Sequence, residues 1–441
     1  MKRDLLRSLI AWKARASRMP LLLRGARQVG KSYLVEHFAQ TYFDDSVTIN
    51  FEQDPHYVRC FTTLYPNEII QKLSIETGKK IIPGKTLLFL DEIQECPNAI
   101  MSLRYFKEQM PNLHVIGAGF LLEFALQEKN FRMPVGRIEM IYLKPLSFRE
   151  YLRAYDYTQL DQLISETTLN NPVPEVAHEK LLQYLKKYLA LGGMPAVHAN
   201  YLLNQDLLEC QRIQTNLLNT YRRDFGKYAK LNKHHYLQEV FIQTPQLIGQ
   251  QIKYVDISKE MRSREIKEAI DLLELAGVVS RVNCNSLSGI PLSSFVNPKK
   301  FKMLFVDVGL VNRSTRIDIN LLLDSEILQA NKGAIAEQFV GQELLAVLPD
   351  NEEPELYYWA NDKLGSMAEV DYITQIDGQV IPIEVKAGKT GRLKSLHMLL
   401  AEKKLPLGLH ISTQPLSQKN NILNLPLYLI SEYQRLVSHS I

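Results

Sequence analysis

Two short stretches near the amino terminus place residues that could do phosphate chemistry at a recognisable spacing. The first, "GARQVGKSY", fits G-x-x-x-x-G-K-[ST] with Gly25, Gly30, Lys31 and Ser32. Glycines let backbone N–H groups close around phosphate oxygens, and a helix that follows offers its positive end. Lys31 would reach the β- and γ-phosphates of ATP, and Ser32 would ligate Mg²⁺. The predicted phosphate-binding loop (P-loop) comprises Gly25, Ala26, Arg27, Gln28, Val29, Gly30, Lys31, Ser32 and Tyr33.

The second stretch, "KTLLFLDEIQECP", is an apolar strand that ends in two acids, Asp91 and Glu92. In open α/β sheets, ligands bind at the carboxyl ends of the strands. Asp91 would hold the magnesium ion through water, and Glu92 would polarise the attacking water. Two solvated acids at a strand end are the alternative, which the P-loop upstream makes the weaker interpretation.

A third stretch, "AEVDYITQIDGQVIPIEVKAG", carries acids on both sides of a turn. Asp377-Gly378 between two β-rich runs predicts a two-residue hairpin. That turn sets the register and places Asp371 opposite Glu384, with Lys386 on the same side. Like charges directly opposite on a sheet are destabilising unless something positive lies between them. Mg²⁺ suits such acids, and Lys386 could activate a water for attack on a phosphodiester; an amphipathic strand with a wet side, or a salt-bridge cluster without catalysis, is the alternative.

The elements that must position these residues can be read from the hydrophobic pattern. Strands are expected at 46–52, 87–90, 113–119 and 137–143, with helical patterns between them, which indicates a doubly wound parallel sheet of the P-loop type. From about 147 to 230 the pattern is helical. Its segment "NTYRRDFGKYAK" mixes aromatic residues with basic ones that could track a phosphate backbone or form an ordinary surface: Arg222, Arg223, Lys227 and Lys230.

The segment "VDISKEMRSREIKEAIDLLELAGVVSRVNC" predicts a short helix, a turn and a longer helix that starts near Ser263, followed by two strands. This is the order of a winged helix, with Arg262, Arg264 and Lys267 at the start of the helix that would read DNA. Winged helices also serve as plain packing domains, so DNA contact and packing both stay open.

Residues 1 to about 435 resemble a known protein family. "RGARQVGKS", "LFLDEIQECP", "IGAG", "PVGRIEMIYLKPLSFREYL", "LGGMP", "LFVDVGLVN", "GAIAEQFVGQEL", "AEVDYI" and "IPIEVKAG" resemble the bacterial and archaeal AAA-type ATPases of the AAA_14 class that carry a C-terminal DUF4143 region. The resemblance implies an arginine finger at Arg137 and hence a homo-oligomer; a surface arginine, or one that pairs with a local carboxylate, is the alternative. One position departs from the pattern, because Phe120 follows "GAG" where a small hydroxyl residue is usual; ATP turnover is then less secure than ATP binding.

The DUF4143 region is regarded as related to the PD-(D/E)xK nuclease core. This resemblance implies catalytic and metal-binding roles for residues in and before the stretch "AEVDYITQIDGQVIPIEVKAG". It implies Glu337, Asp371 and Glu384 as metal ligands and Lys386 as the catalytic lysine. Lys389, Arg392, Lys394 and Ser395, which follow the strand, would contact phosphates.

The composition is that of an ordinary globular protein, and it is compatible with an ATPase that binds nucleic acid. The chain has 441 residues, 46% of them apolar, and a net charge of +4, which permits nucleic acid without demanding it. The four cysteines are far apart and are expected to be reduced in a cytoplasmic protein. No signal peptide or membrane-spanning segment is expected.

The sequence therefore predicts an α/β multidomain protein: an ATPase domain at 1–150, a helical lid at 151–230, a winged helix at 231–315 and a restriction-endonuclease-like domain at 320–441. The first functional hypothesis is an ATPase whose nucleotide state controls a magnesium-dependent, DNA-binding nuclease domain. The second is an ATP-gated switch or DNA-binding regulator that does not cut. A third is an assembly protein that binds ATP for stability.

Overall fold

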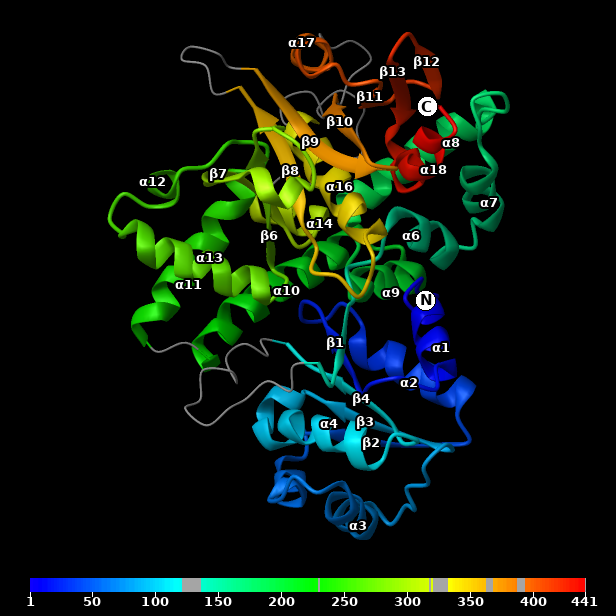
Figure 1. Cartoon of the computed structure of the whole chain (residues 1–441), viewed down its shortest axis with the longest axis vertical. Helices are drawn as coiled ribbons and strands as arrows, with labels where there is room; N and C mark the ends of the chain where they lie inside the picture. Colours follow the sequence, from blue (N-terminus) through cyan, green and yellow to red (C-terminus); the bar gives the residue numbers. More distant parts are fainter. Residues whose placement is uncertain are drawn as a thin grey trace.

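The amino-terminal part is built on a five-stranded parallel sheet (Figure 1). The computed structural model describes residues 1–120, 136–228, 231–316, 319, 332–361, 368–386 and 393–440, with backbone alone at 226–228, 231–233 and 332. The sheet order is β2-β3-β4-β1-β5 and every neighbouring pair is parallel. The strands are β1 (Leu21–Arg24), β2 (Asp45–Asn50), β3 (Thr86–Asp91), β4 (His114–Ala118) and β5 (Glu139–Tyr142). The predicted doubly wound P-loop sheet is confirmed.

Helices cover both faces of this sheet because its strands are apolar on both sides. Leu21 and Leu23 of β1 lie in one buried cluster with Phe38 of α2, whereas Leu22 lies in a second cluster with Leu103 of α4. The helical segments here are α1 (Leu6–Ala14), α2 (Lys31–Tyr42), η1 (Pro55–Phe61), α3 (Pro66–Thr77), η2 (Ile93–Glu95) and α4 (Pro97–Gln109). Burial on both faces fixes β1 and β3 in the centre of the domain, with their carboxyl ends at one edge.

A helical middle region lies between the two sheets in Figure 1. Helix α8 ends at the "LGGMP" turn, where its C-cap residue Gly192 has φ 79°. The Asp307 carboxylate accepts hydrogen bonds from the Gly193 and Leu310 N–H groups and so joins this turn to α14. The helices are α6 (Phe148–Ala154), α7 (Thr158–Glu166), α8 (Glu175–Leu191), α9 (Pro195–Asn204), α10 (Leu207–Tyr228), α11 (Leu231–Gln243), η3 (Thr244–Gln246), α12 (Tyr254–Ile257), α13 (Ser263–Leu275) and α14 (Val308–Ser314).

The carboxyl-terminal part is an eight-stranded mixed sheet of order β12-β13-β11-β10-β9-β8-β6-β7. Its strands are β6 (Val279–Asn285), β7 (Val296–Phe305), β8 (Leu356–Ala360), β9 (Glu369–Ile376), β10 (Gln379–Val385), β11 (Gly408–Ser412), β12 (Ser417–Lys419) and β13 (Ile422–Pro426). The helices that pack on it or follow it are η4 (Leu292–Phe295), α16 (Lys332–Val347), α17 (Lys394–Lys403), η6 (Leu427–Glu432) and α18 (Tyr433–Ser438). Helix α16 contacts both the edge strand β7 and the inner strand β10, so it packs across this part of the sheet.

The hairpin of β9 and β10 has the predicted register. Asp377 and Gly378 have φ angles of 49° and 76°, as a type I′ turn requires, and the pairing runs from Ile376–Gln379 to Tyr372–Ile383. On the other side of β9 the register against β8 shifts between Tyr357 and Trp359. This bulge lies beside Asp371, and bulges of this kind re-aim neighbouring side chains.

The predicted helix–turn–helix and hairpin order is present in α12, α13, β6 and β7. The hairpin is not a separate wing, because β6 pairs in parallel with β8 and the sheet continues into β9 and β10. The domain limits near 315 and 320 stay predictions, and one sheet runs across them. None of the described helices is long and apolar enough to cross a membrane.

Candidate functional site

The P-loop follows β1 directly, and its glycines are required by its backbone path. Gly25 has φ 143°, and a Cβ atom built there would lie 2.2 Å from the Leu143 carbonyl oxygen. Gly30 has φ 93° and forms the N-cap of α2. Both conformations favour glycine, so the loop passes close to the end of β5 and turns its N–H groups toward the start of α2.

Lys31 lies inside this loop and holds it closed on itself. Its ammonium group donates hydrogen bonds to the Gly25 and Ala26 carbonyl oxygens at 3.0 and 2.9 Å. Burial lowers the pKa of Lys31 to about 8, against the opposing influence of Glu92 and Asp91. A buried ammonium group whose partners are neutral carbonyl oxygens would form stronger hydrogen bonds with anionic oxygens. This fits the predicted contact between Lys31 and phosphate.

Ser32 and Asp91 meet as the sequence predicts. Ser32 Oγ donates to Asp91 Oδ2 at 2.8 Å, and Asn50 Nδ2 donates to the same oxygen at 3.1 Å. Burial raises the pKa of Asp91. A hydroxyl beside a carboxylate at a strand end suits magnesium, an oxygen-binding cation, so the residues present fit Mg²⁺ bound with a nucleotide. Asn50 was missed by the sequence analysis, although it lies within the predicted strand 46–52 and ends β2, which neighbours β3.

Glu92 has a backbone conformation that is rare for its residue type. Its φ is 48°, and Gln94 Nε2 donates to its Oε2 at 2.6 Å. Burial raises the pKa of Glu92. Strained non-glycine residues of this kind cluster at active sites, and this one lies directly after the strand that carries Asp91.

The far side of the P-loop is bound to α10, a contact that the sequence analysis did not foresee. Arg27 pairs with Asp224 at 2.8 Å and with Glu52 at 3.2 Å. The Tyr221 hydroxyl donates to the Arg27 carbonyl oxygen at 2.7 Å. Asp224 is only 3% exposed. A buried ion pair of this kind is costly to break from one side, so the loop and the helix are tightly linked.

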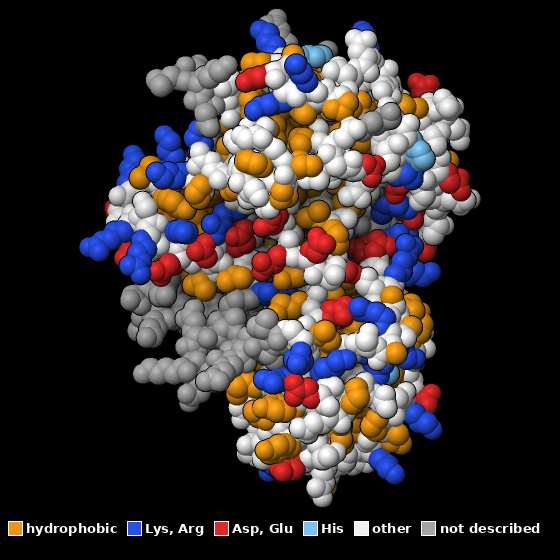
Figure 2. Space-filling view, viewed as in Figure 1, with side chains coloured by type: hydrophobic (Ala, Val, Ile, Leu, Met, Phe, Trp, Pro, Cys, Tyr) orange, Lys and Arg blue, Asp and Glu red, His pale blue; other side chains and the backbone are white. Residues whose placement is uncertain are grey.

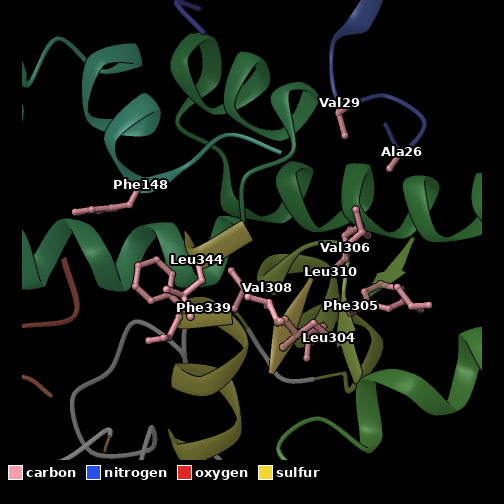
Figure 3. Packing of buried hydrophobic residues seen from close by; sticks show 14 of the residues in the cluster. Ala26, Val29, Phe148, Leu304, Phe305, Val306, Val308, Leu310, Phe339 and Leu344 are labelled. Atoms are coloured by element: carbon pink, nitrogen blue, oxygen red, sulfur yellow. The ribbon is translucent and has the colours of Figure 1, made fainter. Parts of the chain in front are cut away.

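A cavity of about 450 Å³ separates the P-loop from β6 and β7 on another side. It is lined by Gly25 and Ala26, by Gly277 before β6, by Phe305 at the end of β7 and by Val306 after it. Figure 3 shows Ala26 and Val29 on one side of the packed cluster and Phe305 and Val306 on the other. The P-loop still touches this region at Gly277, where a Cβ atom would lie 3.3 Å from the Ala26 nitrogen, so the cavity lies beside a direct contact.

Two further predicted positions lie away from the P-loop lysine. Phe120 is buried and packs edge-on against Tyr221, with ring centroids 6.2 Å apart. Arg137 precedes β5 and lies at the opposite edge of the sheet from the P-loop, where it pairs with Glu108 at 3.1 Å. Arg137 is therefore out of reach of its own P-loop, and a finger role would require a second copy of the chain.

The carboxyl-terminal acids form a cluster around a lysine that the sequence analysis did not name. Lys302 of β7 lies 2.8 Å from Glu337 Oε1, 2.5 Å from Glu369 Oε1 and 3.5 Å from Asp371 Oδ1. Burial opposes its charge, yet these carboxylates raise the pKa of Lys302 above its ordinary value. The signal was a single lysine inside the apolar run "FKMLFV", the same kind of interruption that singled out Lys386.

Glu384 and Lys386 form the second half of this acid cluster. Their oxygen and nitrogen lie 2.6 Å apart, and Asp371 Oδ2 accepts a hydrogen bond from the Val385 N–H at 2.8 Å. Burial, followed by repulsion from Asp371, raises the pKa of Glu384 to about 7. The same two causes raise the pKa of Glu337 to about 7. The predicted residues Glu337, Asp371, Glu384 and Lys386 are thus brought together.

As placed, these acids do not fit a divalent metal. Within the described part of the chain, no three His, Cys, Asp or Glu side chains are grouped so that they could hold one. Lys302 lies between the acids of β9 and Glu337 of α16, and it contacts two of the three metal ligands predicted in this cluster, Glu337 and Asp371. The positive charge expected between the carboxylates is therefore present, but it is an ammonium group.

The residues predicted to contact nucleic acid lie at separate places, among them the α13 amino terminus and the start of α17. Arg264 is exposed and pairs with Glu268, while Glu265 caps the α13 amino terminus at Arg262. Figure 2 shows basic side chains around the α12–α13 end and acidic ones along the junction below it. Lys230, Lys389 and Arg392 lie outside the described residues, as does the side chain of Lys227. Lys394 begins α17, and the Ser395 hydroxyl accepts a hydrogen bond from the Glu369 N–H at 3.4 Å.

Three family models match the chain: an AAA domain (AAA_14) at residues 17–152, a domain of unknown function (DUF8612) at 182–320, and a domain of unknown function (DUF4143) at 332–429. The chain therefore combines an AAA_14 domain with a DUF4143 domain. No curated protein matches it. The AAA_14 match spans the P-loop and both predicted acids of β3, and the DUF4143 match spans Glu337, Asp371, Glu384 and Lys386.

Solved structures show only distant similarity to this AAA_14/DUF4143 protein. The Aeropyrum pernix ORC1 protein in complex with DNA is 13% identical, over 72% of this chain and 93% of that chain, with a TM-score of 0.30. A signal-transduction ATPase with a tetratricopeptide repeat sensor from Pyrococcus horikoshii is 14% identical over 80% and 46%, with a TM-score of 0.26. The Thermotoga maritima RuvB Holliday junction branch migration motor is 14% identical over 64% and 90%, with a TM-score of 0.25.

Proposed function

We propose that this protein is an ATP-binding, AAA-type ATPase that works as a nucleotide-gated switch, and that its carboxyl-terminal domain recognises nucleic acid or a partner without cutting. The observation that carries the proposal is the direct contact between the P-loop and α10. Arg27 contacts Asp224 and Tyr221, so a change in the loop reaches a helix of the middle region. The four cysteines are buried and form no disulfide within the described residues, which supports a reducing, cytoplasmic location.

A line of buried aromatic rings continues from that contact to the carboxyl-terminal sheet. Phe120 packs against Tyr221, Tyr221 against Phe241 at 6.1 Å, and Phe241 against Phe305 at 5.1 Å. All four rings are at most 3% exposed. Phe305 ends β7, the strand that also carries Lys302. Packed side chains with two arrangements can carry coupling between sites, and this aromatic line links the ATP site to the acid cluster.

Hydrolysis is proposed to require a second copy of the chain. Glu92 supplies the water-polarising carboxylate, and Arg137 of a neighbouring copy would supply transition-state charge. Phe120 cannot hydrogen-bond to a phosphate or a water, so turnover by an isolated chain should be slow. This supports a switch that holds ATP for long periods more than it supports a fast motor.

The experiment is hydrogen–deuterium exchange with and without ATP and Mg²⁺. In the wild type, ATP should protect the P-loop and also change exchange in α10 and in residues 296–305. Lys31→Ala should abolish ATP binding and both changes. If ATP binds and protects the P-loop while α10 and β7 are unaffected, the switch proposal is wrong. If Lys31→Ala binds ATP as tightly as the wild type, the P-loop assignment is wrong.

A magnesium-dependent DNA nuclease controlled by ATP is the second candidate. One observation favours it: Glu384 Oε2 is buried without a hydrogen-bond partner, beside Lys386. Linear, branched and single-stranded DNA incubated with Mg²⁺ or Mn²⁺ would separate the two. We expect intact DNA under all conditions. Cleavage that disappears in both Asp371→Ala and Lys386→Ala would establish the nuclease instead.

A further inference from the structure

Lys302 is a fully buried ammonium group in the second half of β7, where its neighbours are apolar. The residue is 1% exposed and lies between Phe301 and Met303, which are also buried. Its nitrogen is 5.2 Å from the centre of the Tyr358 ring. Burying an ammonium costs several kcal/mol unless charged partners offset it. Its charged partners are the carboxylates of Glu337, Glu369 and Asp371.

These partners come from two elements that converge on β7. Glu337 belongs to α16, and its Oε2 is covered by the turn at Gly249, where a Cβ atom would lie only 3.1 Å away. Glu369 and Asp371 belong to β9, beside the bulge. The ammonium nitrogen thus lies at the meeting point of a helix and two strands, in a position closed toward Gly249.

An ammonium group and a divalent cation compete for the same carboxylate oxygens. Mg²⁺ requires oxygen ligands at about 2.0–2.1 Å in an octahedral arrangement and keeps several waters. Lys302 already bonds one oxygen of Glu337 and one of Glu369, and Asp371 Oδ2 is engaged by the Val385 N–H. Glu384 is paired with Lys386. The cluster retains one free buried acceptor, Glu384 Oε2, among these groups.

We propose that Lys302 is the resident cation of this acid cluster and keeps divalent metal out of it, and that removal of its charge would create a divalent-cation site. The four carboxylates, Glu337, Glu369, Asp371 and Glu384, then face only the ammonium of Lys386. A divalent ion restores the lost charge and satisfies Glu384 Oε2. This inference does not depend on the proposed nucleotide switch, because metal binding is measured without nucleotide.

The test is a Mn²⁺ titration of the nucleotide-free full-length chain, followed by the electron paramagnetic resonance signal of free Mn²⁺. Lys302→Met removes the charge but keeps the length of the side chain. Lys299→Met, on an exposed position of the same strand, is the matched control. Asp371→Asn is made alone and combined with Lys302→Met to show whether any bound ion is in this cluster.

We expect the wild type, Lys299→Met and Asp371→Asn to take up Mn²⁺ equally weakly. Lys302→Met should bind one ion at least about tenfold more tightly, and the double variant should lose that gain. A folded Lys302→Met protein without the gain would overturn the proposal. If Lys302→Met does not fold, the comparison of the wild type with Asp371→Asn still tests the proposal. Mn²⁺ uptake by the wild type that Asp371→Asn removes would show that Lys302 does not exclude metal. Equal uptake by the two proteins supports exclusion.

Discussion

At the scale of single residues, the parts of the nucleotide site that could be predicted are those fixed by local sequence. Gly25, Gly30 and Lys31 are defined by spacing, because a phosphate cradle needs particular backbone angles over a few consecutive residues. Asn50, Asp224 and Lys302 were not found. Each acts through a contact with a residue far away in the chain, and no local pattern records such a partner.

The glycine at position 25 provides a direct test of the P-loop geometry. Gly25→Ala places a methyl group 2.2 Å from the Leu143 carbonyl oxygen at a φ of 143°. We expect loss of ATP binding and a decrease in the free energy of unfolding of roughly 1–3 kcal/mol. Gly78→Ala is the control, since Gly78 also has a positive φ but no atom within 4 Å. Equal losses in both variants would mean that strain at φ, and not the contact with β5, decides the effect.

His198 in α9 gives a pH dependence with a defined sign. Its Nε2 lies 2.6 Å from the Gly192 carbonyl oxygen and its Nδ1 lies 3.1 Å from the Tyr155 hydroxyl, which suits a neutral ring. Burial lowers the pKa of His198 from 6.5 to about 4. Because the unfolded chain then binds the proton more tightly, this residue's contribution is complete above pH 6.5 and is lost as the pH falls toward 4.

The loss associated with His198 should reach roughly 3 kcal/mol at the acid end of that range. Urea unfolding at pH 7.5 and pH 5 measures it by comparison with His198→Gln, whose amide does not titrate. The neighbouring Tyr151, Tyr155 and Tyr188 stay neutral in this range, so the difference between the two proteins isolates the histidine. Identical pH slopes for the two proteins would contradict the assignment.

At the scale of elements, the hairpin of β9 and β10 was predictable and its surroundings were not. Asp377 and Gly378 specify the turn, and the turn specifies the register. The bulge beside Asp371 and the pairing of β6 with β8 depend on tertiary packing. As a result, the acids lie together as predicted, while the ammonium group of Lys302 beside them was not foreseen.

The aromatic line yields a prediction for the coupling between elements. Phe241→Leu removes the ring between Tyr221 and Phe305 and should cost roughly 1–2 kcal/mol of stability. ATP affinity should stay within about twofold, because Phe241 does not touch the P-loop, whereas the ATP-induced change in β7 exchange should shrink. Phe106→Leu, equally buried but in the second core cluster of the ATPase domain, is the control. A β7 response that both variants preserve would exclude the aromatic line as the route.

At the scale of the whole molecule, the position of Arg137 makes an oligomer testable. Arg137 and Arg104 both pair with Glu108 Oε1, at 3.1 and 3.0 Å, so either substitution removes one partner of the same carboxylate. We expect Arg137→Ala to lower ATP hydrolysis strongly with unchanged ATP binding, and Arg104→Ala to lower it little.

Mixing variants provides the corresponding readout for a shared site. Glu92→Gln and Arg137→Ala should each be inactive alone, and their mixture should regain part of the ATPase rate, since a mixed pair contains one intact site. A mixture that stays inactive although the copies associate would remove the finger assignment. Size-exclusion chromatography with light scattering establishes whether they associate.

The eight-stranded sheet also limits how the coding regions of its two parts can recombine during evolution. Its strands β6 and β7 lie within the DUF8612 match and its strands β8 to β13 within the DUF4143 match. A gene that passed on the second region without the first would leave β8 as a bare sheet edge, open to pairing with other chains. The carboxylates of Glu337, Glu369 and Asp371 would also lose their ion pairs with the ammonium group of Lys302. Recombination between relatives should therefore keep the two regions together, or else supply both a covering strand and a new cation.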